Sequence, residues 1–328
     1  MSRRSVVALA LVTIVGLGHA ALATSSAVYH NPVYDHDFPD PFVLAAGGVY
    51  WAYATNDGWN VQTLRSPNGL SWVPVTTDAL PRLPAWAQPG QTWAPEVVTA
   101  GGRYVMWYST ARRGDGVHCL SRAVAGMPQG PFIDTTTAPT FCQADQGGAI
   151  DPSPFVDIHG QLWLAWKSEG RGRGAQPPTI WSARLTADGL RFASWPSALI
   201  RADRAWEGGV VEAPTLVSDG GRTYLFYSGN RWNTAQYAVG WASCAGPWGP
   251  CAKGPGPVLA SGGSVAGPGG QTVFRDAGGA PWLGYHGWSA WAVGYPRGYR
   301  SFRLEQLAFG GGRPVVQGPS DTIRVSVR

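Results

Sequence analysis

The chain has 328 residues, a formal charge of +5, and only 14% charged residues beside 44% hydrophobic and 12% aromatic ones. Its arginines are scattered and form no basic run, so the positive charge does not indicate a nucleic-acid-binding protein, in which cations usually cluster. The 45 glycines, 27 prolines and 17 tryptophans favour turns and pleated strands over helices.

The chain opens with two arginines and an apolar run over residues 6–16, followed by small residues at 21–23. This order is typical of a secretory signal peptide, which we expect to be cleaved near Ala23 or Ala27. The apolar run is shorter than the roughly 20 residues that a membrane span requires. We therefore predict a signal peptide over residues 1–23 and a secreted protein, extracellular or periplasmic, with no membrane association after cleavage.

One pattern recurs along the rest of the chain: an acidic residue and a proline, an apolar strand, a tight turn, and a strand rich in aromatics. Its copies read DFPDPFVLAAGGVYWAYAT (37–55), WAPEVVTAGGRYVMWYS (93–109), DPSPFVDIHGQLWLAWKS (151–168), EAPTLVSDGGRTYLFYS (212–228) and, more weakly, GGQTVFRDAGGAPWLGYH (269–286). The prolines of the first four copies, Pro41, Pro95, Pro152 and Pro214, are 54, 57 and 62 residues apart. Such a period with several strands per unit predicts a β-propeller. Five copies predict an all-β, five-bladed propeller that forms a single domain over residues 24–328.

The predicted blades leave no room for a second domain. They span residues 37–80, 92–139, 150–199, 210–259 and the region from 267 onward. In blade one, Gln62–Arg65 predicts the third strand, and a Ser-Pro-Asn-Gly turn precedes a strand at Trp72. Residues 319–327 predict a final strand packed on the last sheet. Helical periodicity is absent throughout.

The four cysteines fall into two local pairs, and an even number in an exported chain predicts disulfides. Of the three possible pairings we expect Cys119 with Cys142 and Cys244 with Cys251, because each pair then stays within one blade. A zinc site is the alternative. The chain has no Cys-x-x-Cys motif, and His118 beside Cys119 is isolated, which argues against zinc.

Acidic residues open three of the repeats. The first strand of each blade lines the propeller axis, so Asp40, Asp151 and Glu212 should converge on one pocket. Carboxylates that meet there repel one another and lose solvation, and both effects raise at least one pKa, as a general acid needs. An Asp before Pro is often only a turn residue. These three, however, lead into hydrophobic strands, where an unpaired carboxylate would be costly to bury.

The set DFPDP, WAPE, IDPS, VEAP and GPGGQ followed by YH resembles glycoside hydrolase family 43, the five-bladed arabinanases, α-L-arabinofuranosidases and β-xylosidases. The resemblance covers residues 37–326. It implies that Asp40 is the general base that activates water, that Glu212 is the general acid, and that Asp151 orients the acid and raises its pKa. Such enzymes invert the anomeric configuration, which requires acid and base to lie about 6.5–9.5 Å apart.

Two further glutamates compete for a role. Glu207 also precedes the blade-four strand and is the rival for the acid, but it lies beside two glycines and lacks the following proline. We therefore favour Glu212. Glu96 follows Trp93-Ala94-Pro95, and we interpret it as supporting structure, because its side chain alternates away from that of Trp93 in a regular strand.

Aromatic residues are expected to contact the sugar, whose apolar face stacks on an aromatic ring, while polar groups bind its hydroxyls. Trp93 opens blade two at the axial end and is the best platform, and Phe38 beside Asp40 is a second wall residue. His286 ends a blade-five strand and is expected to reach the pore. Arg300 resembles an arginine that many relatives place near the base, where it would keep Asp40 ionised.

Blade five departs from the arabinanase pattern. The arabinanases usually carry Gly-His-Asn-Ser there, with the histidine helping to hold calcium or water in the pore, whereas this chain has Gly269-Gly270-Gln271-Thr272. The difference argues against a structural calcium ion and assigns Gln271 to substrate contact. We expect no required cofactor. The GPGGQ and DFPDP spellings resemble the exo-acting arabinofuranosidases that act on α-1,5-linked chains.

The predicted activity is thus the release of arabinose from oligo- or polysaccharides by a secreted, monomeric, inverting glycosidase. Alternatives are a β-xylosidase or endo-arabinanase of the same family, a retaining enzyme of the related propeller families that act on fructans, and a propeller that binds glycan without catalysis. A retaining enzyme would hold its carboxylates only about 5–5.5 Å apart. A binding module has no need of three axial carboxylates.

Overall fold

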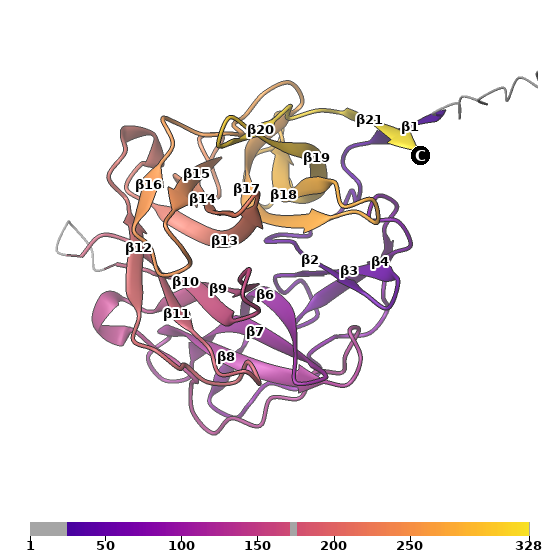
Figure 1. The fold of residues 1–328 in the computed structure, drawn as a ribbon. Coiled ribbons are helices and arrows are strands. Elements are labelled where there is room, and N and C mark those ends of the chain that lie inside the picture. Colours follow the sequence, from indigo (N-terminus) through magenta and orange to yellow (C-terminus); the bar gives the residue numbers. More distant parts are fainter. Residues whose placement is uncertain (1–24, 171–175, 328) are drawn as a thin grey trace, which may run out of the picture.

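The computed structural model describes residues 25–170 and 176–327 as five antiparallel sheets arranged around one axis, with an added two-stranded sheet at the rim. The all-β, five-bladed propeller is confirmed (Figure 1). The predicted signal peptide at residues 1–23 lies outside the described residues. No helix in the described part of the chain is long and apolar enough to cross a membrane.

Each blade is a run of consecutive strands. Blade one holds β2 (Phe42–Ala46), β3 (Val49–Ala54), β4 (Gln62–Ser66) and β5 (Val73–Pro74). Blade two holds β6 (Ala87–Ala100), β7 (Arg103–Arg112) and β8 (His118–Ala125). Blade three holds β9 (Ala149–Val156), β10 (Leu162–Ser168), β11 (Thr179–Arg184) and β12 (Ser197–Arg201). Blade four holds β13 (Val211–Asp219), β14 (Arg222–Gly229), β15 (Ala238–Cys244) and β16 (Cys251–Lys253). Blade five holds β17 (Val265–Arg275), β18 (Pro281–Ser289), β19 (Ser301–Gly310) and β20 (Arg313–Val316). Short 3-10 turns, η1 (Ala144–Gln146) and η2 (Ala205–Glu207), lie between blades.

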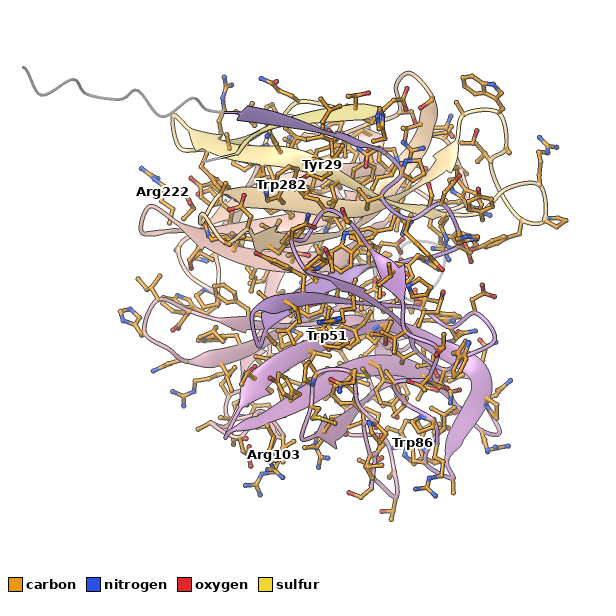
Figure 2. All side chains as sticks on the ribbon, turned by 90° about the vertical axis from the view of Figure 1, so that its right-hand side faces the viewer. Tyr29, Trp51, Trp86, Arg103, Arg222 and Trp282 are labelled. Carbon is orange, nitrogen blue, oxygen red and sulfur yellow. A yellow bond between two sulfur atoms is a disulfide. The ribbon has the colours of Figure 1, made fainter. Side chains whose placement is uncertain are left out.

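The innermost strands, β2, β6, β9, β13 and β17, surround the centre of the disc (Figure 1). Each runs to a tight turn and is followed by its partner, the second strand of the blade. Figure 2 shows Arg103 and Arg222, which begin the second strands β7 and β14, projecting from the same edge of the molecule. The turns that precede β7 and β14 therefore lie toward one face of the disc, and β6 and β13 begin toward the other face (Figure 2).

The second strands are buried on both sides because each is covered by a blade on either side. Every residue of β10 is buried. Side chains alternate along a strand, so Leu164 and Trp166 pack toward blade two whereas Trp163 packs toward blade four. This is why the middle of each second strand is a run of apolar and aromatic residues and does not alternate between apolar and polar residues.

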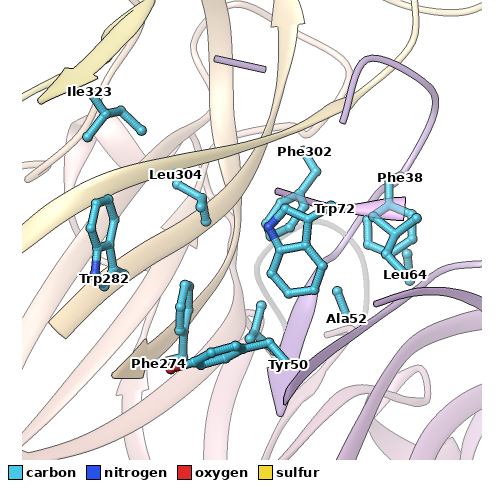
Figure 3. Close-up of a cluster of buried hydrophobic side chains, with 12 residues drawn as sticks. Phe38, Tyr50, Ala52, Leu64, Trp72, Phe274, Trp282, Phe302, Leu304 and Ile323 are labelled. Atoms are coloured by element: carbon cyan, nitrogen blue, oxygen red, sulfur yellow. The ribbon is translucent and has the colours of Figure 1, made fainter. Parts of the chain in front are cut away.

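The core of the described residues consists of five apolar clusters, one at each boundary between neighbouring blades. Figure 3 shows the cluster at the boundary of blades one and five, where Tyr50 and Trp72 lie near Phe274 and Phe302. Burial of each large apolar side chain contributes about 1.5–3 kcal/mol. The propeller is thus held together mainly by sheet-to-sheet packing.

The final strand packs on blade five as predicted, because Ile323 is buried with Trp282 and Leu304, but it is not hydrogen-bonded to that sheet. β21 (Thr322–Val327) pairs with β1 (Ser25–His30), and the pair forms a separate sheet at the rim. β20 already completes blade five, so the C-terminal strand finds its partner in an N-terminal strand that the repeat pattern does not include. Both predicted disulfides, Cys119–Cys142 and Cys244–Cys251, are present.

Candidate active site

A backbone kink lies within, or just before, every inner strand. The kinked residues have positive φ: Asp40 (54°), Ala94 (44°), Asp151 (55°), Ala213 (49°) and Gly270 (55°). Residues other than glycine rarely adopt this conformation. It persists where surrounding structure fixes it, commonly at functional sites.

Hydrogen bonds between blades hold these kinks. The N–H of Ala94 donates to Thr55 Oγ1, that of Asp151 to Ser109 Oγ and that of Gly270 to Ser228 Oγ, at 2.9–3.0 Å. Each acceptor stands within the last four residues of the second strand of the preceding blade, or directly after it.

Two members of this series differ from the others. The Asp40 N–H donates to His286 Nδ1 at 2.9 Å, which joins blade five to blade one. The Ala213 N–H donates to Asp151 Oδ2 at 2.9 Å, so a carboxylate replaces the hydroxyl there. We call these five bonds the kink ring. Asp40 and Asp151 therefore belong both to the cavity wall and to the ring.

The three carboxylates each open a repeat, but the kinks show that they do not occupy equivalent positions. Asp40 and Asp151 are themselves kinked residues, whereas Glu212 stands one position before the kink at Ala213, as Trp93 does before Ala94. The register also shifts between Glu212 and Thr215. Glu212 and Trp93 are thus structural equivalents, and both line the cavity.

A cavity of about 720 Å³ is lined by Asp40, Asp151 and Glu212, so the structure brings the three predicted carboxylates together. The remaining acidic residues of its lining are Asp37, Asp57 and Glu169. Its cationic residues are Lys167, Arg231 and Arg300, and its aromatic residues are Trp93, Trp232, Tyr237 and Tyr295. The volume is in the range of ordinary ligand pockets.

On one side of the cavity, Asp40 is held by a hydroxyl and a guanidinium group. Thr55 Oγ1 donates to Asp40 Oδ2 at 2.6 Å, and Arg300 Nη1 lies 3.6 Å from Asp40 Oδ1. The Asp40 side chain is 23% exposed, so water can reach it. Arg300 is thus placed beside Asp40 as predicted.

Arg300 is itself fixed by aromatic rings. Its guanidinium lies 4.5 Å from the ring centre of Trp232 and 5.8 Å from that of Tyr295. Its Nε donates to the Tyr295 hydroxyl at 3.3 Å, and its backbone N–H donates to Asp37 Oδ1 at 2.8 Å. Because stacking and hydrogen bonds act together, the cation is held in one position next to Asp40.

The other side of the cavity is organised around Lys167. Its Nζ lies 2.9 Å from Glu212 Oε2 and 2.9 Å from Glu169 Oε2, and its side chain is only 5% exposed. Burial alone would lower the pKa of Lys167, but the charges of Glu212, Glu169 and Asp151 outweigh it and raise that pKa. Lys167 is therefore a permanent cation.

Asp151 is the carboxyl group that retains a proton. Burial, followed by the charge of Glu212, raises its pKa to about 8, although Lys167 and the Ala213 N–H act in the opposite direction. Glu96 lies near it, and burial raises the pKa of Glu96 well above its ordinary value, with the charge of Asp151 adding to the effect. Near neutral pH this side holds protons on carboxyl groups, which is the condition for acid chemistry.

Trp93 lines the cavity with one face of its indole covered. The His118 ring stacks on it, with centroids 3.7 Å apart and planes 20° apart. Burial lowers the pKa of His118, so this ring is neutral near pH 7. The predicted platform is therefore supported from behind.

Three predicted substrate contacts lie behind the wall instead of on it. Phe38 is fully buried in the apolar cluster between blades one and five. Gln271 is 2% exposed and is bonded to Ser228 Oγ and the Ala213 carbonyl. His286 is fully buried under Asp40. None of the three lines the cavity, and the prediction of direct sugar contact is corrected accordingly.

The pore residues do not fit a calcium site. His286 Nδ1 accepts the Asp40 N–H, so its ring proton is on Nε2, and a protonated nitrogen cannot ligate a cation. The Gln271 carbonyl oxygen already accepts the Ser228 hydroxyl. In the described part of the chain, no group of three or more His, Cys, Asp or Glu residues could hold a metal ion.

Glu207, the rival for the acid, is outside the cavity. It is fully buried, lies 2.6 Å from Lys253 Nζ and accepts the Tyr227 hydroxyl at 2.9 Å. Its other oxygen accepts the N–H groups of Asp203 and Arg204. Each oxygen is engaged by this network, which braces blade four.

Sequence reasoning missed Lys167, Glu169 and Tyr237. A signal was available for Lys167, because a lysine in an otherwise apolar second strand must meet a carboxylate when it is buried. The signal for Tyr237 was Gly269, where a Cβ would lie 2.1 Å from the tyrosine ring. That glycine allows the ring to pass close to the backbone.

Comparison with known proteins matches this geometry to one family. The model of glycosyl hydrolases family 43 matches residues 29–314. A β-D-galactofuranosidase, xynD, of Aspergillus niger is 25% identical over 244 residues, covering 69% of this chain and 66% of that protein. An extracellular exo-α-(1→5)-L-arabinofuranosidase, ArbA, of Cellvibrio japonicus is 23% identical over 215 residues and 58% of each chain.

Among solved structures, a thermostable family-43 glycoside hydrolase superposes with a TM-score of 0.81 at 26% identity, covering 92% of this chain and 99% of that one. The two curated relatives are matched over 66% and 58% of their own length.

Proposed function

Because the chain belongs to glycosyl hydrolase family 43, we propose that it is an inverting glycosidase that releases arabinose from α-L-arabinofuranosyl linkages. The observation that carries the proposal is the contrast between the two sides of one cavity. Asp40 lies beside a fixed cation, whereas Asp151 retains a proton to about pH 8 and stands next to Glu212.

In this proposal Asp40 is the general base. Thr55 and Arg300 stabilise its negative charge and orient its oxygens, and its exposed fraction admits the attacking water. Asp40 takes a proton from that water as the oxygen attacks the anomeric carbon. A positioned base of this kind contributes about 10²–10⁴-fold.

Glu212 is the general acid, and Asp151 holds the proton with it. Burial and the charge of Glu212 raise the pKa of Asp151, so this carboxyl group keeps a proton beside the acid. As the glycosidic bond breaks, Glu212 donates the proton to the leaving oxygen, and Asp40 on the other side completes an inversion. Inversion requires an acid-to-base separation of about 6.5–9.5 Å.

The substrate is proposed to be a neutral furanoside. Six carboxyl groups line the cavity against three cations, and Lys167 and Arg300 lie beside carboxylates, so an anionic sugar would meet repulsion. Trp93, supported by His118, offers one indole face to a sugar ring. The names of two relatives contain furanosidase, and one is exo-acting and extracellular. We accordingly propose exo-acting hydrolysis outside the cytoplasm, without a metal cofactor.

The test is proton NMR of the anomeric signal during hydrolysis of α-1,5-arabino-oligosaccharides. Release of single arabinose units with inverted configuration is expected. Retained configuration would contradict the proposed mechanism. Release of xylose from xylo-oligosaccharides, with no release of arabinose, would show that the proposed substrate is wrong. Longer products from the interior of arabinan would indicate endo action.

A further inference from the structure

The feature that goes beyond the assigned catalytic carboxylates is the Lys167 ammonium group. It lies 2.9 Å from one oxygen of Glu212 and 2.9 Å from one oxygen of Glu169. A cation in direct contact favours the ionised form of a carboxyl group. This contact opposes the function of Glu212, because a general acid must carry a proton when it meets the substrate.

Glu169 weakens that opposition. It stands just beyond β10, two residues from Lys167, and its side chain is 33% exposed whereas that of Glu212 is 11% exposed. The Lys167 ammonium group therefore interacts both with the partly exposed carboxylate of Glu169 and with the more buried one of Glu212. The more firmly Glu169 holds Lys167, the less the cation acts on Glu212.

In the described part of the chain, other titratable groups also surround Glu212. Asp151 approaches from β9, Asp40 from the kink before β2, and Tyr237 from the segment before β15. β17 contributes Gln271 and β14 contributes Ser228, which carry no charge. Lys167 is thus the cation in contact with Glu212, and it faces carboxylates from several sides.

We propose that Lys167 and Glu169 form a charge regulator for Glu212, in which Lys167 draws the shared proton toward Asp151 and Glu169 limits that effect. The proposal rests on the function proposed above and makes Lys167 and Glu169 positioning residues. The two side chains act with opposite sign on one proton. Loss of the Lys167 charge lets Glu212 keep its proton to higher pH, and loss of the Glu169 charge makes it lose the proton at lower pH.

The first test needs no substrate. The chain has five glutamates, Glu96, Glu169, Glu207, Glu212 and Glu305, so carboxyl ¹³C NMR of protein labelled at glutamate is tractable. The Glu212 signal is assigned by its loss in Glu212→Gln. Its titration midpoint should rise by about one pH unit or more in Lys167→Met, fall by less in Glu169→Gln, and stay near the wild-type value in Lys167→Arg.

The second test is the pH profile of kcat/KM on an arabino-oligosaccharide. Its alkaline limb should move in the same two directions, and should move little on an activated aryl glycoside whose leaving group needs no proton. Arg275→Gln is the matched control, because it also removes one cation but from the exposed pair with Asp219. That variant should leave both midpoint and limb unchanged.

The outcomes separate the two proposals. Midpoints that do not move, or that move in the same direction in Lys167→Met and Glu169→Gln, would overturn the regulator. If Lys167→Met does not fold, the downward shift in Glu169→Gln still decides the matter, because that side chain is partly exposed. If the Glu212 midpoints of Lys167→Met and Glu169→Gln shift in opposite directions but the enzyme cleaves xylosides and no arabinosides, the charge regulator is upheld and the proposed arabinoside substrate is wrong.

Discussion

The two sides of the cavity use the same carboxyl chemistry with different ratios of cations to carboxylates. Beside Asp40 stands Arg300, held by Trp232 and Tyr295. On the other side, Lys167 is shared among Glu212, Glu169 and Asp151. The first ratio favours a negative charge, and the second leaves a carboxyl group protonated.

The difference is made by the neighbours and not by the residue type. Asp40 and Asp151 are both aspartates that precede a proline, and their backbone φ angles are nearly equal, 54° and 55°. One has a side chain 23% exposed next to a guanidinium, and burial raises the pKa of the other to about 8. Equivalent positions in a repeat can therefore take opposite chemical roles.

The sharpest way to test this contrast is to remove one carboxylate from each side. Asp40→Ala should lose about 10²–10⁴-fold in kcat on natural and on activated substrates, because an activated water is needed in both. Glu212→Ala should lose a similar factor on arabino-oligosaccharides but much less on an aryl glycoside with a good leaving group. Equal losses on both substrates in Glu212→Ala would contradict its role as acid.

Asp151 tests whether one residue serves both the chemistry and the kink ring. Asp151→Asn should lose about 10²-fold in kcat on oligosaccharides yet remain well folded, because its amide oxygen can still accept the Ala213 N–H. Asp151→Ala should show a similar loss of activity and also lower the free energy of unfolding by about 1–3 kcal/mol, since a buried N–H loses its acceptor. Urea denaturation of both variants measures the difference. Equal stability would remove Asp151 from the ring.

The Asp40 side depends on aromatic support. Trp232→Ala should lower kcat/KM by roughly threefold to thirtyfold, because a stacked cation is worth about 0.5–2 kcal/mol and Arg300 would no longer be fixed beside the base. Kinetics on an aryl arabinofuranoside measure this. Trp291→Ala, which removes a largely exposed indole, serves as the control. An equal loss in both would attribute the effect to tryptophan removal in general.

A further prediction concerns stability as a function of pH. Folded Asp151 keeps its proton to about pH 8, whereas an aspartate ordinarily loses it near 3.8. Between these values the folded chain binds the extra proton, so this group's contribution to the free energy of unfolding falls as pH rises. Relative to wild type, Asp151→Asn should therefore become more stable from pH 5 to pH 8. Urea midpoints at the two pH values test it, and a constant difference would contradict it.

The repeats predicted most of the fold because each carries a complete blade. Five copies predicted five blades, and both disulfides followed from keeping each pair within a blade. The pairing of β1 with β21 could not be predicted from the repeats, because neither strand belongs to one.

The carboxylates were predictable, but their surroundings were only partly so. A kink shifts the alternation of side chains, and its position is not visible in an apolar pattern. For that reason Glu212 appeared equivalent to Asp40, although Trp93 is its true counterpart. Phe38 and His286 adjoin the site in the chain or the fold but turn away from the cavity. Lys167 comes from a second strand, whereas the predicted catalytic residues were all taken from the openings of first strands.

The boundary between the first and last blades differs from the other four. There the segment before β2 crosses to β19, where Val33 and Tyr34 bond to Phe302, and the Asp40 bond to His286 closes the kink ring. The first and last described strands, β1 and β21, pair beyond it at the rim. The proposed base, Asp40, thus stands at the boundary where the ring of blades is closed. Blades one and five are not consecutive in the chain, so they can separate without a covalent bond being broken. On heating, separation of blades one and five would displace Asp40 and abolish activity while the other four blade boundaries stayed packed. Thermal inactivation is therefore expected at a lower temperature than the main calorimetric unfolding transition.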